Sequence, residues 1–380
     1  MSESKLGTKM KKAASDAKAK LRWLPLRRAR LPRAAQILPY LRRIDKNQWY
    51  TNFGKLNTAF ESRLAAHFGV EPQNLATFAN ATLALTASLH AQGVKAGQYC
   101  LMPSFTFIAT PASVIAAHLE PYFLDVDRSS WALEPEIVER ALARGLTNVG
   151  AVMPVSPFGA PLDAKAWDAF SKRTGIPVVL DAAWAFDSLH AGANLAVVSL
   201  HATKVMGIGE GGLIVSRLPK TVATARKLSN FGFGESHMSE LPSGNSKMSE
   251  YAAAMGLAAL DEWPKRRAAL ISVSANYRKA LHGIPGVRLM DWFGKHAVAT
   301  CPVQMTSPIG VREIDLLRQR GVEGRLWWGQ PCHVHPAYSR YKRDLLTNTE
   351  WLAGRVLCLP FYAELTKSDV LRVRDAVAEI

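Results

Sequence analysis

The stretch VVSLHATKVMGIGEGGLIV, residues 197–215, decides how this chain is interpreted. Its two apolar runs, residues 197–200 and 213–215, predict short buried strands. Between them lie Lys204 and a glycine-rich turn, and glycine lets backbone approach a ligand closely. A partly desolvated lysine has a lowered pKa and can form a Schiff base with a carbonyl compound. The alternative is a surface lysine in a hairpin loop.

A second stretch, PVVLDAAWAFD at residues 177–187, places an acid before this lysine. The apolar run 178–180 is typical of a buried strand in a parallel sheet. Asp181 then lies at the carboxyl end of the strand, where open α/β sheets bind ligands. An acid and a lysine in this order fit pyridoxal 5'-phosphate (PLP), with the acid keeping the pyridine nitrogen protonated. The alternative is that Asp181 caps a helix starting at Ala182.

Four motifs occur in an order typical of one protein family. They are FANATLAL at 78–85, PSFTFIAT at 103–110, DAAWA at 181–185, and SLHATK at 199–204 with GEGG at 209–212. Together they resemble the DegT/DnrJ/StrS family of PLP-dependent sugar aminotransferases. The resemblance extends from about Gln36 to the end of the chain, and it implies PLP as cofactor.

The alternation of predicted strands and helices favours a doubly wound, mainly parallel α/β sheet. The resemblance implies the aspartate aminotransferase-like transferase fold (fold type I), in which helices flank the sheet of a large domain and a smaller α+β domain follows. We expect a large PLP-binding domain over residues 36–260 and the small domain over residues 261–380.

The remaining residues, 1–35, are predicted to be a basic, disordered arm. Residues 1–43 hold 13 Lys and Arg against 2 Asp and Glu, and so contribute most of the net charge of +16. Such an arm could contact a membrane surface or another polyanion. We favour a solvated arm and expect no specific nucleic-acid binding.

The composition sets further expectations. No run of eighteen apolar residues is present, so no transmembrane helix is expected. The four cysteines are scattered, which favours reduced thiols in the cytoplasm over a disulfide framework. No ligand spacing typical of a metal site is present, and the pair His333 and His335 does not make one by itself.

The resemblance assigns cofactor-binding roles to several residues. Ala81 and Thr82 open a helix whose N-terminus would hold the PLP phosphate, together with Ser199. Phe107 would stack on the pyridine ring. Trp184 stands where the family usually has Gln or His, and an indole can only donate a hydrogen bond. The catalytic pair would be Lys204 and Asp181.

The resemblance also assigns residues that would contact the substrate or a second subunit. By resemblance, Asn245 reaches the neighbouring subunit's cofactor phosphate, so the active sites of a homodimer would be shared. Lys247 replaces a family arginine near the substrate, keeping the charge but not the bidentate geometry. His333 corresponds to the family's active-site histidine, although a histidine in such a loop is often only hydrogen-bonded.

The expected reaction is amino transfer, from glutamate by resemblance, to a keto group of a nucleotide-linked sugar through a Lys204 Schiff base. Polysaccharide or glycosylated-metabolite biosynthesis is the corresponding family-level expectation. Alternatives are a PLP-dependent dehydratase or ring-forming relative of the same fold, and a PLP-binding regulatory protein. Sugar-dehydrating relatives carry His at the lysine position, so Lys204 favours amino transfer.

Overall fold

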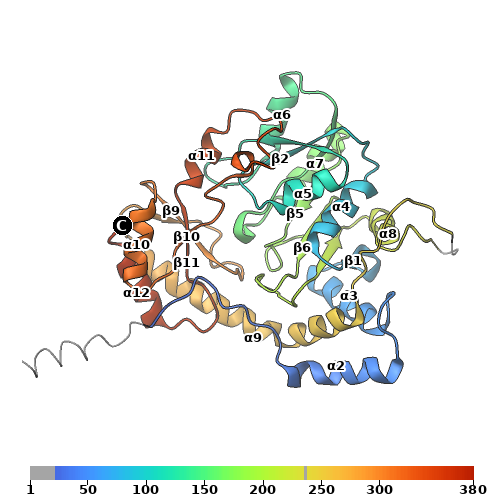
Figure 1. Ribbon diagram of the computed structural model, residues 1–380, viewed down its shortest axis with the longest axis horizontal. Helices are drawn as coiled ribbons and strands as arrows, with labels where there is room; N and C mark the ends of the chain where they lie inside the picture. The colour runs from blue at the N-terminus through green and yellow to red at the C-terminus, as the bar shows by residue number, and fades with distance from the viewer. Residues whose placement is uncertain (1–21, 235–237) are drawn as a thin grey trace, which may run out of the picture.

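The computed structural model describes residues 22–234 and 238–380. Figure 1 shows a large sheet with helices on both faces and a second, smaller sheet formed by the C-terminal part of the chain. The predicted α/β class is therefore confirmed.

The large sheet is built from two hydrogen-bonded groups of strands, in the orders β1-β7-β6-β5 and β3-β2-β4. Parallel bridges join them, pairing Val152 with Val178 and Val155 with Asp181. Only β7 runs antiparallel to its neighbours. The strands are β1 (Leu75–Phe78), β2 (Tyr99–Pro103), β3 (Glu120–Leu124), β4 (Val149–Val152), β5 (Val179–Asp181), β6 (Leu195–Ser199) and β7 (Gly212–Val215).

Alternating side chains of these strands enter two separate hydrophobic cores. In β6, Val197 belongs to one core, whereas Ala196 and Val198 belong to the other. Both faces are buried, which is why these strands appear in the sequence as unbroken apolar runs. The helices of the large domain are α2 (Ala34–Asn47), α3 (Lys55–Phe68), α4 (Ala81–Ala91), α5 (Ala109–Ala116), α6 (Pro135–Ala143), α7 (Ala164–Thr174) and α8 (Pro219–Leu228).

The 32-residue helix α9 (Glu250–Leu281) connects the large sheet with the small one. Ser249 caps its N-terminus, with its side chain accepting a hydrogen bond from the Ala252 amide. Residues 260 and 261, between which we expect the domain boundary, both lie inside this helix.

The small sheet is antiparallel, with strand order β10-β11-β9-β8. Its elements are β8 (Val287–Leu289), β9 (Cys301–Met305), α10 (Val311–Gln319), β10 (Arg325–Leu326), α11 (Thr347–Ala353), β11 (Val356–Leu359) and α12 (Lys367–Val377). Short 3-10 helices complete the fold at η1 (Pro72–Asn74), η2 (Pro157–Gly159) and η3 (Cys332–Val334).

Residues 22–33, which we call the N-terminal strap, correct the expectation of a disordered arm. Leu24 is fully buried and exchanges backbone hydrogen bonds with Gly321 and Glu323. The Leu26 carbonyl accepts a hydrogen bond from the Phe361 amide. Apolar residues between the arginines thus anchor this basic segment on the C-terminal domain. Residues 1–21 of the predicted arm lie outside the described residues.

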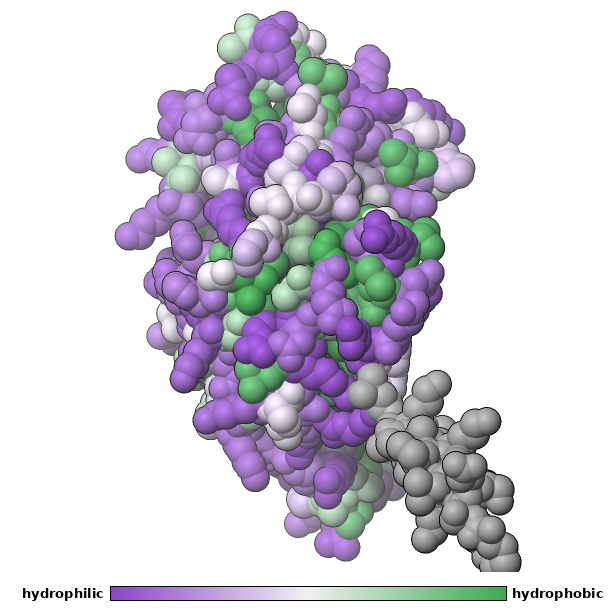
Figure 2. All heavy atoms as spheres, turned by 90° about the vertical axis from the view of Figure 1, so that its left-hand side faces the viewer, coloured by the Kyte–Doolittle hydropathy of each residue, from purple (hydrophilic) through white to green (hydrophobic). Residues whose placement is uncertain are grey.

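The surface formed by the C-terminal elements is mainly hydrophilic, with hydrophobic side chains in small groups (Figure 2). None of the helices in residues 22–234 and 238–380 combines the length and apolarity needed to span a bilayer. All four cysteines are buried and free. Within the same residues, no three His, Cys, Asp or Glu side chains form a potential metal site.

Candidate active site

A cavity of about 670 Å³ lies at the carboxyl ends of the parallel strands. Strands β1, β2, β5 and β6 each lead into loops that line it, which is where a doubly wound sheet binds ligands. Seven of the ten predicted site residues meet there: Ala81, Thr82, Phe107, Asp181, Trp184, Ser199 and Lys204.

Asp181 is buried and held in a fixed orientation at the end of β5. Its Oδ2 accepts a hydrogen bond of 2.8 Å from the Thr110 hydroxyl, and its Oδ1 accepts one of 3.2 Å from the Ala183 amide. Burial raises the pKa of this carboxyl, while these hydrogen bonds and the charge of Lys204 oppose the rise. Turns follow Asp181 in place of the alternative helix starting at Ala182.

Lys204 reaches the same cavity from the glycine-rich turn between β6 and β7. Its Nζ lies 3.9 Å from the centroid of the Trp184 indole. Desolvation lowers the pKa of the Lys204 amine to about 7, although the charge of Asp181 acts in the opposite direction. At that pKa a large fraction of the amine is neutral and nucleophilic near neutral pH. Its place in the cavity wall against the Trp184 indole contradicts the alternative of an ordinary surface lysine.

The N-terminus of α4 forms one wall. Asn80 caps the helix, with its side chain accepting from the Leu83 amide at 2.9 Å, so Ala81 and Thr82 occupy the first turn. The first amides of a helix are free to bind an anion. Gly212 permits this arrangement, because a Cβ there would lie 2.6 Å from the Ala81 nitrogen.

Ser199 and Phe107 complete the predicted cofactor-binding set. Ser199 is buried at the end of β6, and its Oγ accepts a 3.3 Å hydrogen bond from the His201 amide. Phe107 lies in the loop between β2 and α5 and is 52% exposed. Its ring therefore has a free surface on which a planar ligand could stack.

The structure adds cavity residues that the sequence analysis did not assign to the site: Arg27, Thr110, Trp327 and Trp328. Thr110 is the last residue of the motif PSFTFIAT, three positions after Phe107. This closeness to a predicted site residue is the only indication of its role in the sequence. Arg27 had no such signal, because only the folded strap brings it to the cavity.

Three predicted residues do not line this cavity within the chain. Asn245 is exposed on the loop before α9, and Lys247 donates a 2.7 Å hydrogen bond to the Asn230 carbonyl oxygen Oδ1. His333 is buried, with its Nδ1 2.8 Å from the Ser104 hydroxyl. Lys247 and His333 therefore lie outside the described cavity, and their substrate contacts stay predictions.

The chain is similar along almost its whole length to known proteins of one family. A sequence model of the DegT/DnrJ/EryC1/StrS aminotransferase family matches residues 33–378. A dTDP-4-amino-4,6-dideoxy-D-glucose transaminase from Shigella dysenteriae is 30% identical over 353 residues, which cover 90% of this chain and 94% of the relative.

Two solved structures are similar in fold and sequence. A protein of Bacillus cereus ATCC 10987 assigned as a PLP-dependent aminotransferase has a TM-score of 0.87 at 31% identity, covering 94% of this chain and all of that one. The structure of DesI in the presence of its TDP-sugar product has a TM-score of 0.84 at 31% identity, covering 94% and 93%.

Proposed function

Because this chain belongs to the DegT/DnrJ/EryC1/StrS aminotransferase family, we propose that it transfers an amino group from glutamate to a keto group of a nucleotide-linked sugar. PLP is the cofactor. The observation that carries this proposal is the presence of Lys204 and Asp181 in one cavity, the amine with a pKa of about 7 and the carboxylate buried and hydrogen-bonded.

The cavity fits PLP in its size and in the chemistry of its walls. The first amides of α4 and the hydroxyls of Thr82 and Ser199 suit a phosphate. Asp181 suits a protonated pyridine nitrogen, and the exposed ring of Phe107 suits the planar pyridine. When bound, PLP supplies an aldehyde that condenses with amines and a ring that accepts electrons from the reacting carbon.

Lys204 has two tasks in this proposal. Its neutral amine would hold the cofactor covalently through the aldehyde, and, once freed, the same amine would accept and return the proton as general base and acid. A pKa of about 7 suits both directions of that transfer, because neither protonation state dominates near neutral pH. Asp181 keeps a positive charge on the ring nitrogen.

The substrate class is supported by the relatives. The Shigella dysenteriae relative is named for a dTDP-linked amino sugar, and DesI was solved with a TDP-sugar. Trp327 and Trp328 line the cavity beside Trp184, and flat aromatic surfaces suit sugar and base rings. The four buried free thiols support a reducing compartment such as the cytoplasm.

We also propose a homodimer with shared active sites. Large apolar side chains are exposed near the cavity and the start of α9, and these are Trp49, Tyr50, Leu83, Phe107, Phe231, Phe233 and Tyr251. The Tyr50 and Tyr251 rings stack 6.4 Å apart, which joins two of the segments involved. Such a surface is typical of a subunit interface, and it leaves Asn245 free to act in a neighbour's site.

The proposed function is tested by following the two half-reactions separately. The PLP-loaded protein is expected to show a visible absorption band that glutamate removes and that a dTDP-linked keto sugar restores. Lys204→Ala should lack the band, whereas Lys220→Ala, an exposed lysine on α8, should keep it. A protein that responds to no amino donor would contradict amino transfer, and a sugar product without nitrogen would indicate a dehydratase.

A further inference from the structure

The strap places one arginine in the active-site cavity. The guanidinium carbon of Arg27 lies 3.8 Å from the Trp327 ring centroid and 5.3 Å from the Trp184 ring centroid. Trp184 also contacts the Lys204 amine, so both cations adjoin one indole. Residue 27 precedes the part of the chain that the family model matches, which begins at residue 33.

Among residues 22–234 and 238–380, no carboxylate pairs with the charge of Arg27. Its Nη1 donates a weak hydrogen bond of 3.4 Å to the Thr203 carbonyl, and no Asp or Glu oxygen in this part of the chain lies within 4.0 Å of the guanidinium. Desolvation lowers its pKa to about 10, so the group remains charged at neutral pH. A desolvated cation without a partner is unfavourable unless a ligand compensates it.

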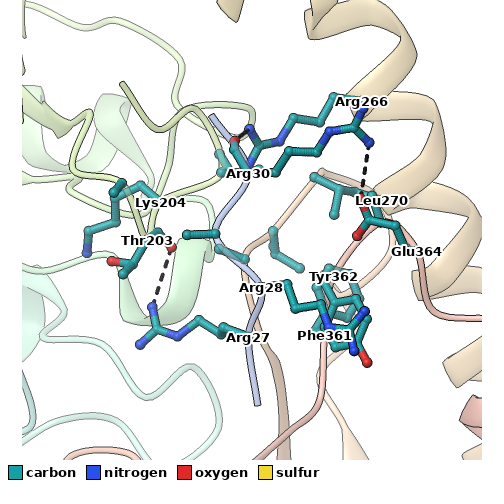
Figure 3. A pocket seen from close by; sticks show the side chains of 16 residues that line it. Arg27, Arg28, Arg30, Thr203, Lys204, Arg266, Leu270, Phe361, Tyr362 and Glu364 are labelled. Atoms are coloured by element: carbon teal, nitrogen blue, oxygen red, sulfur yellow. Dashed lines mark hydrogen bonds and ion pairs between the residues drawn. The ribbon is translucent and has the colours of Figure 1, made fainter. Parts of the chain in front are cut away.

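Figure 3 shows that neighbouring arginines of the strap point in different directions. Arg27 extends towards Thr203 and Lys204, whereas Arg28 extends towards Tyr362, with its guanidinium carbon 4.9 Å from that ring centroid. Between them and α9 lies a small cavity of about 210 Å³. The strap therefore delivers a single arginine to the larger cavity, with the next one as a natural control.

We infer that Arg27 binds the α-carboxylate of the amino donor and thereby selects amino acids as donors. This inference rests on the proposed function. A guanidinium recognises an anionic oxygen group by paired hydrogen bonds. Besides the PLP phosphate, which the first amides of α4 suit, the cavity would meet three such groups: the α-carboxylate and the side-chain carboxylate of glutamate, and the diphosphate of the nucleotide. The α-carboxylate is attached directly to the carbon that carries the reacting amine, whereas the side-chain carboxylate and the diphosphate lie several bonds from a reacting carbon. Because Arg27 lies beside the Trp184–Lys204 contact, its position favours the α-carboxylate.

Trp184 and Trp327, which meet edge to face with their ring centroids 5.9 Å apart, explain why an arginine rather than a lysine is suited to this place. Planar guanidinium can stack on Trp327 and still present its edge to a ligand. The same indoles exclude water, so the ion pair with a carboxylate would be stronger than one on the surface. Arg27→Lys should therefore recover only part of the donor recognition.

The test compares two donors of nearly equal size in the first half-reaction: glutamate and its α-amide, isoglutamine. For the wild type, the rate constant of the first half-reaction divided by the dissociation constant of the donor should be larger for glutamate than for isoglutamine. Arg27→Gln should reduce this preference about tenfold or more, while Arg28→Gln should leave it unchanged. Because the readout is a ratio within one protein, a general loss of stability or of active fraction does not alter it.

A second measurement separates the donor from the nucleotide. Binding of dTDP should be the same in wild type and Arg27→Gln if the donor carboxylate is the ligand. An unchanged donor preference overturns the inference, and weakened dTDP binding in that case assigns Arg27 to the diphosphate. Both results differ from failure of the proposed function, in which the wild type itself responds to neither donor.

Discussion

At the scale of single residues, the site depends on one burial effect acting on two groups of opposite charge. Burial favours the neutral form of each group, lowering the pKa of Lys204 and raising that of Asp181, while their mutual attraction opposes both changes. The pair therefore titrates closer to neutral pH than either group does in water.

The titration of Lys204 gives a prediction. Only the neutral amine attacks an aldehyde, so the rate of PLP capture by the cofactor-free protein should rise with pH, with a midpoint near the Lys204 pKa of about 7 rather than 10.5. The positive charge of Arg27 contributes to the lowering. Arg27→Gln should move the midpoint to higher pH, whereas Arg28→Gln should not. A wild-type midpoint near 10 would contradict the desolvated amine.

Thr110 is predicted to be a positioning residue for Asp181. Its hydrogen bond lowers the pKa of the Asp181 carboxyl. Thr110→Val removes the donor at nearly constant volume, so the acidic limb of the pH profile should move to higher pH. A hydrogen bond to a charged group contributes about 1.5–3 kcal/mol, so kcat should fall about 10- to 100-fold. Thr110→Ser should restore kcat and the pH of the acidic limb. Equal pH profiles for the Val and Ser variants would show that the hydrogen bond from Thr110 to Asp181 is unimportant.

At the scale of elements, the close packing of β7 against the start of α4 has a steric origin. In Gly212→Ala, the new Cβ would meet the backbone of Asn80 and Ala81 at 2.6 Å, so the N-terminus of α4 must move. We expect a loss of about 1–3 kcal/mol in stability and weaker PLP binding. Gly244→Ala is the matched control, since nothing lies within 4 Å of its Cβ position. Denaturant unfolding and cofactor titration measure the two effects.

The strap gives a second prediction at this scale. Leu24 is fully buried against the C-terminal domain, whereas its neighbour Trp23 is 44% exposed. Leu24→Ala should weaken docking of the strap by about 2 kcal/mol or more, increase proteolysis around residues 22–33, and lower the donor preference as Arg27→Gln does. Trp23→Ala should change none of these. Unaltered protease resistance in Leu24→Ala would show that the strap does not depend on this anchor.

The sequence predicts elements well where their signals are local. Both strands around Lys204 and the strand before Asp181 are confirmed, because a strand buried on both faces gives a continuous apolar run. The order of the strap could not be predicted from its own residues, because their high positive charge is typical of a disordered arm. Its anchors, Leu24 and Leu26, are fixed by residues about 300 positions away in the chain. The position of Arg27 likewise depends on these distant residues. The role of Asn245 stays a prediction, because the structure of one chain cannot test a contact with another subunit's site.

At the scale of the whole molecule, the arrangement of the exposed apolar segments predicts cooperation between two subunits. Lys204→Ala lacks the catalytic amine, and Asn245→Ala lacks the side chain that would complete the neighbouring site. If the sites are shared, a mixture of the two variants forms heterodimers with one intact site, and about a quarter of the wild-type activity should return. No recovery after subunit exchange, verified by isolating mixed dimers of two differently tagged chains, would confine Asn245 to its own chain.

The strap also has a consequence for how the protein is made. Arg22 pairs with Asp369, and the Leu26 carbonyl accepts a hydrogen bond from the Phe361 amide, so the strap is held by residues more than 300 positions later in the chain. A nascent chain on the ribosome can form the large sheet before those residues exist, yet it cannot seat Arg27 until they have been synthesised. Competence to recognise a donor would then be acquired later than the fold of the large sheet.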